Sequence, residues 1–124
     1  FLLPLSEAGV DIFHCSQRGF WGPEFDGGDL NLAGWTRKIT GKPAITVGSV
    51  GLNADFIPVP GEVTFREAEP ASLDELERRL SDNEFDLVAV GRALISNPSW
   101  VDMVRDDRPD DIKPFRKEHL GQLV

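Results

Sequence analysis

Two short stretches of this sequence combine glycine with groups that bind anions. Gly48-Ser49-Val50-Gly51 follows one apolar run, and Gly91-Arg92 follows a second, "FDLVAV". Glycine has no Cβ, so a ligand can approach the backbone N–H groups beside it closely. A guanidinium can donate two parallel hydrogen bonds to a phosphate or carboxylate, and a short helix over "ALISNP" would add N–H donors at its start. The pattern predicts an anion site formed by Gly48, Ser49, Gly91 and Arg92.

A simpler interpretation fits the same residues. The glycines could serve only to turn the chain, and Arg92 could pair with one of the 21 acidic side chains. The residues alone leave both interpretations open.

Composition excludes several classes of function. The 124 residues carry a net charge of -8, which repels nucleic acid and anionic membrane surfaces and confines any anion site to a local patch. Cys15 is the only cysteine, and the chain has no Cys/His cluster with metal-ligand spacing, so we expect no metal and a reducing, cytoplasmic location. No apolar run approaches the roughly 20 residues of a membrane helix.

The elements that must position the anion site alternate between strand and helix. Three β-rich runs cover residues 10–16, 43–49 and 85–92, and they lack the alternation of a strand with one wet face, so we expect both faces to be covered. Helices are expected after each run, with Asn31 and Asn97 as N-caps and Ser72 and Glu75 as a capping box. Their inward residues should be Leu32, Trp35 and Ile39; Leu73, Leu76 and Leu80; and Val101 and Val104.

This order predicts an α/β fold with parallel strands, either an open doubly wound sheet or a closed (β/α) barrel. The connections from strand to helix, residues 16–30 and 49–71, are much longer than those from helix to strand. Long loops in a compact domain are usually functional. Because α/β proteins bind ligands at the carboxyl ends of their strands, both long loops lie where a site is expected.

The motifs "GVDIFHCSQRGF", "GKPAITVGSVGL" and "FDLVAVGRALISNPSW" resemble, in this order, the carboxyl-terminal third of the old yellow enzyme family of FMN-dependent NAD(P)H oxidoreductases. The resemblance covers nearly all of residues 1–124. It implies strands six to eight of a (β/α)8 TIM barrel, about three βα units, with a polar tail at about 108–124. It also implies FMN as cofactor, NAD(P)H as reductant, a small-molecule acceptor such as an activated alkene, and the FMN phosphate held by Gly48, Ser49, Gly91 and Arg92.

The residues that family members use on the acceptor are not expected here. The family binds the acceptor through a His/Asn or His/His pair on strand four and commonly protonates it from a tyrosine, whereas this sequence contains no tyrosine. By the resemblance, strands one to five would precede Phe1. We therefore expect no catalytic residue in this chain, and expect it to be inactive by itself.

Several other residues keep two interpretations. Ser16, Gln17 and Arg18 would lie near the flavin or substrate, and His14 is expected inside the barrel, whereas Cys15 is expected to be a buried small hydrophobe. Within the loop of residues 17–31, the aromatic side chains could cover a flavin or only pin the loop to the protein; they are Phe20, Trp21 and Phe25.

The alternatives to an oxidoreductase fragment are a non-catalytic half-barrel, which binds a phosphorylated ligand or forms a homo-oligomer through its strand edges, and another phosphate-binding barrel. His119 is expected to be exposed in the tail, and Trp100 to be a packing residue.

Overall fold

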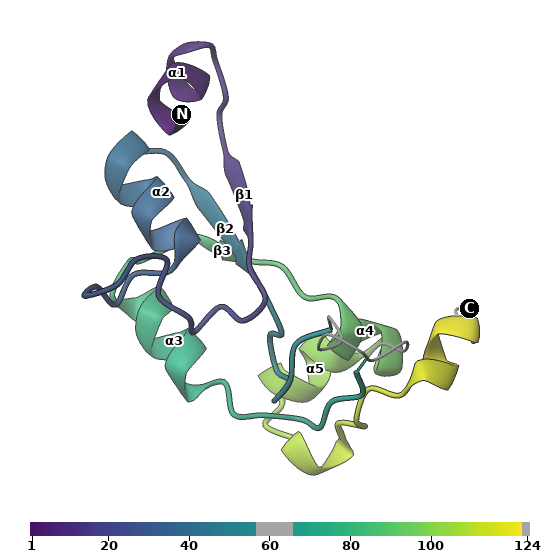
Figure 1. Ribbon diagram of the computed structural model, residues 1–124. Helices are drawn as coiled ribbons and strands as arrows, with labels where there is room; N and C mark the ends of the chain where they lie inside the picture. The colour runs from purple at the N-terminus through teal and green to yellow at the C-terminus, as the bar shows by residue number, and fades with distance from the viewer. Residues whose placement is uncertain (57–65, 123–124) are drawn as a thin grey trace. The chain divides into compact units, whose positions relative to one another are not determined.

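The computed structural model describes residues 1–56 and 66–122 as an α/β protein with a three-stranded, open parallel sheet. The alternation of helix and strand expected from the sequence is confirmed (Figure 1). Its elements are α1 (Leu2–Glu7), β1 (Phe13–Ser16), α2 (Leu32–Thr40), β2 (Ala44–Val47), α3 (Asp74–Ser81), β3 (Leu87–Val88), α4 (Arg92–Ser96), α5 (Trp100–Arg105) and the 3-10 helices η1 (Pro109–Asp111) and η2 (Lys117–Gly121). None of the helices in this part of the chain is long and apolar enough to cross a membrane.

The chain forms two compact units, each assembled from two segments. The first consists of Phe1–Gly48 and Leu73–Ala89, and the second of Ser49–Ser72 and Val90–Val124. The first contains α1, α2, α3 and the sheet, and the second contains α4, α5, η1 and η2.

The sheet has the order β1-β2-β3, with Phe13 opposite Ala44 and Ile45 opposite Leu87. The paired strands are shorter than the β-rich runs, and β3 has only two residues instead of the eight of residues 85–92. An apolar run marks where backbone is buried, but pairing ends where the neighbouring strand ends.

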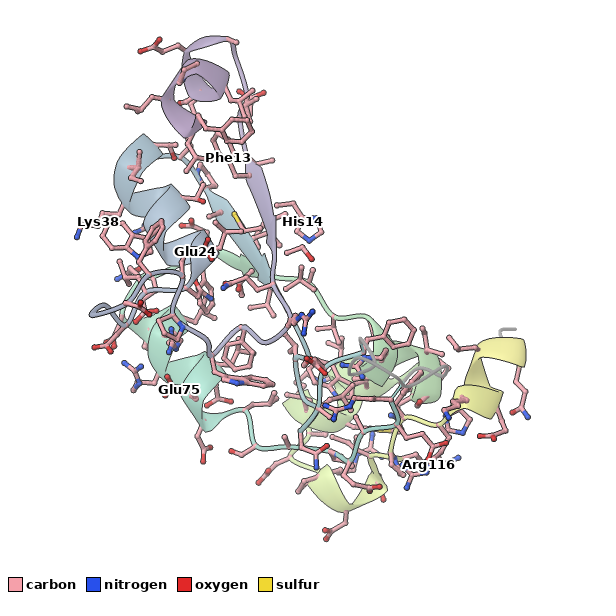
Figure 2. The ribbon with its side chains drawn as sticks, in the orientation of Figure 1. Phe13, His14, Glu24, Lys38, Glu75 and Arg116 are labelled. Carbon is pink, nitrogen blue, oxygen red and sulfur yellow. The ribbon has the colours of Figure 1, made fainter. Side chains whose placement is uncertain are left out.

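One face of the sheet is covered and the other is not. Helix α2 lies along β1 and β2 (Figure 1), and it covers the face that carries Phe13 and Cys15, both of which are buried. The opposite face carries His14 and Ser16, which are exposed, and Leu87, which is 52% exposed. Figure 2 shows His14 on the side of β1 away from α2. The expectation that both faces are covered is therefore wrong for the described chain.

Helix α2 has the expected ends but not the expected face. The Asn31 side chain caps it by accepting a hydrogen bond from Gly34 N (2.8 Å), and Gly41 ends it in the left-handed conformation at φ 67°. The prediction of Leu32, Trp35 and Ile39 as the buried face is wrong. The helix instead buries its small residues, because these let its backbone approach the sheet closely; they are Ala33, Gly34 and Thr36.

The capping box predicted for α3 is also wrong. The helix begins at Asp74, and its N-cap position is occupied by Leu73, which forms no side-chain capping hydrogen bond, rather than by Ser72. Glu75 forms ion pairs with Arg78 and Arg79 instead. Leu76 is buried as expected, but Leu80 is 40% exposed.

In the second unit the helix expected from Asn97 begins later. Ser99 occupies the N-cap position of helix α5 but forms no side-chain capping hydrogen bond, and Val101, expected to face inward, is 60% exposed. The residue that packs is Trp100, at 6% exposed, as expected. Asn97 follows the last residue of α4 and donates from its side chain to Ala93 O (3.0 Å), so it ends one helix rather than starting the next.

Candidate functional site

Arg92 and Ser49, two of the four residues predicted for an anion site, lie together in the second unit. Arg92 is the first residue of α4, and its Nη2 donates to Ser49 Oγ (2.9 Å) and to Ala54 O (2.6 Å). Both acceptors are neutral oxygens. The contacts fix the position of the guanidinium, but these neutral acceptors bring no negative charge to it.

Two phenylalanines pack against the Arg92 guanidinium. Its Cζ lies 5.5 Å from the ring centroid of Phe56 and 5.5 Å from that of Phe115. The two rings also meet each other edge to face, with centroids 6.2 Å apart at 66°. Aromatic faces attract a cation and exclude water from it, so they hold the guanidinium in one place and weaken its hydration.

The electrostatics of Arg92 differ from those of an ordinary surface arginine. Burial lowers the pKa of Arg92, and the charge of Asp55 only partly opposes this effect. Asp55 itself forms an ion pair with Arg66 (3.4 Å). Among the described residues, the hydrogen-bond acceptors of Arg92 are Ser49 and Ala54 and include no carboxylate, and its buried Nη1 has no hydrogen-bond partner. A buried donor on a half-buried cation is costly, and a bound anion would satisfy both the donor and the charge.

The backbone around Ser49 is held in an uncommon conformation. Ser49 has φ 51° and Gly51 has φ 71°, so the chain passes twice through the left-handed region. Glycine adopts this region without cost, whereas serine there is strained. The strained position is the one whose hydroxyl accepts from Arg92. Gly51 lies against Trp100, because a Cβ built on it would be 3.0 Å from that ring.

The two predicted glycines occupy opposite environments. At Gly48, where φ is 154°, an added Cβ would lie 2.6 Å from Gln17 O and 3.0 Å from Phe20 N. The space that the absent side chain leaves is therefore filled by the protein's own loop, and Gly48 O accepts from Phe20 N (3.0 Å). At Gly91 an added Cβ would meet no atom within 4 Å. Gly91 has open space beside Arg92, which is what a bound group requires.

The carboxyl-terminal segment is part of this site, which sequence reasoning missed. Phe115 is fully buried, and it pairs with Ala68 through Phe115 N to Ala68 O (2.8 Å) and Ala68 N to Phe115 O (3.2 Å). Arg116 forms an ion pair with Glu69 (2.6 Å), and Figure 2 labels Arg116 in this segment. A single aromatic residue in a stretch of charged residues was the available signal, because such a residue is usually an anchor.

Hydrogen bonds of Asn97 and His119 also hold the carboxyl-terminal segment in place. The Asn97 side chain donates to Lys113 O (2.9 Å) and accepts from Lys113 N (2.8 Å). Ser96 Oγ lies 2.8 Å from His119 Nδ1. The expectation that His119 is simply exposed is wrong, because it is half-buried and hydrogen-bonded.

In the first unit, the loop of residues 17–31 is pinned to the protein. Phe20 is 4% exposed, and the Gln17 side chain accepts from Leu32 N (2.8 Å). Arg79 donates to Trp21 O (3.1 Å). These contacts favour the anchoring interpretation of Phe20, whereas Trp21 and Phe25 remain 43% and 56% exposed.

The remaining first-unit residues form no reactive cluster. Cys15 is buried, as expected, and its thiol donates to Thr36 Oγ1 (3.4 Å). Across residues 1–56 and 66–122, no three His, Cys, Asp or Glu side chains are grouped to hold a metal ion.

No protein-family model matches this sequence, and no curated protein matches it.

Proposed function

We propose that this chain binds the phosphate of FMN and forms part of an FMN-dependent NAD(P)H oxidoreductase similar to old yellow enzyme. The observation that carries the proposal is the buried Arg92 Nη1, which has no partner among the described residues. The guanidinium is partly desolvated and fixed by neutral oxygens, and the preceding residue, Gly91, has open space where a side chain would be. A phosphate dianion supplies the charge and the acceptors that this arrangement lacks.

The residues present fit a phosphate group. Arg92 would hold it through Nη1, and Gly91 would leave room for its oxygens. Ser49 and Ala54 would keep the guanidinium oriented through Nη2. Gly48 belongs to the first unit, where the absence of a side chain accommodates the loop at Gln17. FMN, when bound, supplies hydride transfer between NAD(P)H and a small-molecule acceptor such as an activated alkene.

The proposed architecture is the carboxyl-terminal part of a (β/α)8 TIM barrel. Its support is the parallel order β1-β2-β3, in which neighbours in sequence are neighbours in the sheet. In such a barrel the uncovered face that carries His14 and Leu87 would be the interior. With no tyrosine in its sequence, the chain lacks the family's proton donor, so we expect no reduction of cyclohexenone by these 124 residues above a free-flavin control.

A second candidate is a homo-oligomer that functions as a non-catalytic binding module. It is favoured by the apolar surface of the first unit, which includes Phe1 at 97%, Ile12 at 42% and Leu87 at 52% exposed. Strands β1 and β3 are also the edges of the sheet, and edges and apolar faces of this kind promote association. Sedimentation that shows a single monomeric species of this chain would exclude this candidate.

The test of FMN binding compares two ligands that differ only in the phosphate. Arg92→Ala should weaken FMN binding by about one to two powers of ten, since charge-assisted pairs contribute roughly 1.5–3 kcal/mol. Arg92→Lys should recover part of the loss, because an ammonium is a point charge without the two-pronged geometry. Riboflavin, which has no phosphate, should bind all three proteins alike.

If FMN and riboflavin lost affinity equally, Arg92 would support the fold rather than bind phosphate. If inorganic phosphate bound at Arg92 but neither flavin bound, the chain would be a phosphate-binding module of another kind.

A further inference from the structure

The carboxyl-terminal segment brings an aromatic ring to Arg92 from far along the sequence. Phe115 is 23 residues beyond Arg92 by number, yet its ring centroid lies 5.5 Å from the guanidinium carbon. The ring itself is fully buried, so it cannot move without disrupting its surroundings.

The segment is fastened on both sides of Phe115. Before it, Lys113 exchanges two hydrogen bonds with the Asn97 side chain, at 2.9 and 2.8 Å. At Phe115 the backbone forms an antiparallel bridge with Ala68. After it, Arg116 pairs with Glu69, and this contact raises the pKa of Arg116. A buried ring held by backbone and side-chain contacts on either side is positioned rather than merely enclosed.

The second ring comes from the other long loop. Phe56 lies two residues after Ala54, whose carbonyl accepts from Arg92 Nη2 at 2.6 Å. Phe56 is half-buried, and its ring is also 5.5 Å from the guanidinium carbon. Nη2 already has two acceptors, so a ligand would use the remaining donors of the guanidinium, and the buried Nη1 is one of these.

We infer that Phe115 and Phe56 are positioning residues of the anion site, so that the carboxyl-terminal segment sets how strongly Arg92 binds phosphate. The inference rests on the proposed function, and it assigns a role to a segment that the sequence presents only as a polar tail. The rings act through Arg92: they restrict its rotamers and keep water from competing with the anion.

The test replaces each ring while keeping an apolar side chain, and it measures FMN and riboflavin binding to the chain. Phe115→Leu should weaken FMN binding about tenfold, and Phe56→Leu about threefold, because cation–π contacts are worth more when they are buried. Riboflavin affinity should change by less than about twofold. Phe56→Trp should keep FMN affinity, since indole is the better cation–π partner and Phe56 is only half-buried.

The control is Phe85→Leu. Phe85 is 1% exposed in the first unit, so the same substitution should lower stability without changing the ratio of FMN to riboflavin affinity.

The outcomes separate this inference from the proposed function. If Arg92→Ala lowers FMN affinity alone while both leucine variants leave the ratio unchanged, phosphate binding stands and the positioning role is refuted. If Phe115→Leu is too unstable to assay, Phe56→Leu and Phe56→Trp decide the matter. If Arg92→Ala does not change the ratio, the proposed function fails and the positioning role fails with it.

Discussion

Two arginines, one in each unit, show what distinguishes a structural cation from a binding cation. Arg79 of α3, at 5% exposed, forms ion pairs with Glu75 (2.7 Å) and Glu84 (3.2 Å). It also donates to the carbonyl oxygens of Asp29 and Trp21, at 3.0 and 3.1 Å. Its charge and its donors are used within the protein, and they tie the loop of residues 17–31 to α3.

Arg92 has the opposite arrangement. Its acceptors are neutral, and the described residues supply neither an ion pair nor a partner for Nη1. A buried arginine with two carboxylates stabilises the fold, whereas a half-buried arginine without any ion pair is costly until an anion arrives. The contrast teaches that burial alone does not identify a functional charge. What identifies it is the set of partners that the fold provides or withholds.

The largest expected effect follows from replacing each arginine by methionine. Arg79→Met should lower the free energy of unfolding by roughly 3–5 kcal/mol, because it leaves Glu84 and two loop carbonyls without their buried partner. Arg92→Met should change it by less than about 1 kcal/mol, because the lost contacts are offset by removing a desolvated charge. Urea denaturation measures both. Equal destabilisation by the two variants would remove the distinction between them.

The two glycines provide a second, smaller contrast. Gly48→Ala should destabilise the first unit by roughly 1–3 kcal/mol, since its Cβ would lie 2.6 Å from Gln17 O at a φ of 154°. Gly91→Val should leave stability nearly unchanged, because its Cβ enters open space, but should weaken FMN binding by filling the room for phosphate. Thermal unfolding and FMN titration of both variants test this. A Gly91→Val protein with normal FMN affinity would place the phosphate elsewhere.

The smallest effect concerns acid stability. Hydrogen bonds from Arg78 and then Arg79 lower the pKa of Glu75 from 4.5 to about 2. A lowered pKa in the folded state means that the carboxylate stabilises the fold above pH 4.5, and that this contribution is lost as the pH falls from 4.5 towards 2. The effect should be modest because the pair is exposed and screened by salt.

Glu75→Gln should therefore flatten the dependence of melting temperature on pH in this window. Glu77→Gln, on the same helix, is the matched control, because Glu77 forms no ion pair within the described residues. If Glu77→Gln had the same effect as Glu75→Gln, general charge repulsion would explain the acid sensitivity.

The sequence predicted the parts of the fold that depend on local signals. Asn31 and Gly41 mark the ends of α2, because capping needs only a side-chain oxygen or a residue that tolerates positive φ. The sequence did not predict which face of α2 is buried or that Val101 is exposed. The buried side of a helix depends on the elements that pack against it. Leu32 and Ile39 are more apolar than Ala33, yet only a small residue allows close packing.

For the candidate site, local chemistry placed Ser49 and Arg92 together but could not find the rings beside them. The position of Phe115 depends on a backbone bridge to Ala68, across 47 residues, which no local pattern encodes. The sequence predicts Gly48 and Gly91 equally as anion-site glycines. The structure shows that protein atoms fill the space beside Gly48, whereas the space beside Gly91 is open.

The most direct test of a phosphate-binding Arg92 observes both arginines in one experiment. The guanidinium resonances of Arg92 and Arg79, assigned by NMR with Arg92→Lys and Arg79→Lys, are followed while FMN is added to the chain. The Arg92 resonance should shift and saturate with FMN and stay unchanged with riboflavin, whereas the Arg79 resonance should move with neither ligand. An Arg92 resonance that ignores FMN while the flavin binds, or that responds equally to riboflavin, would contradict the account.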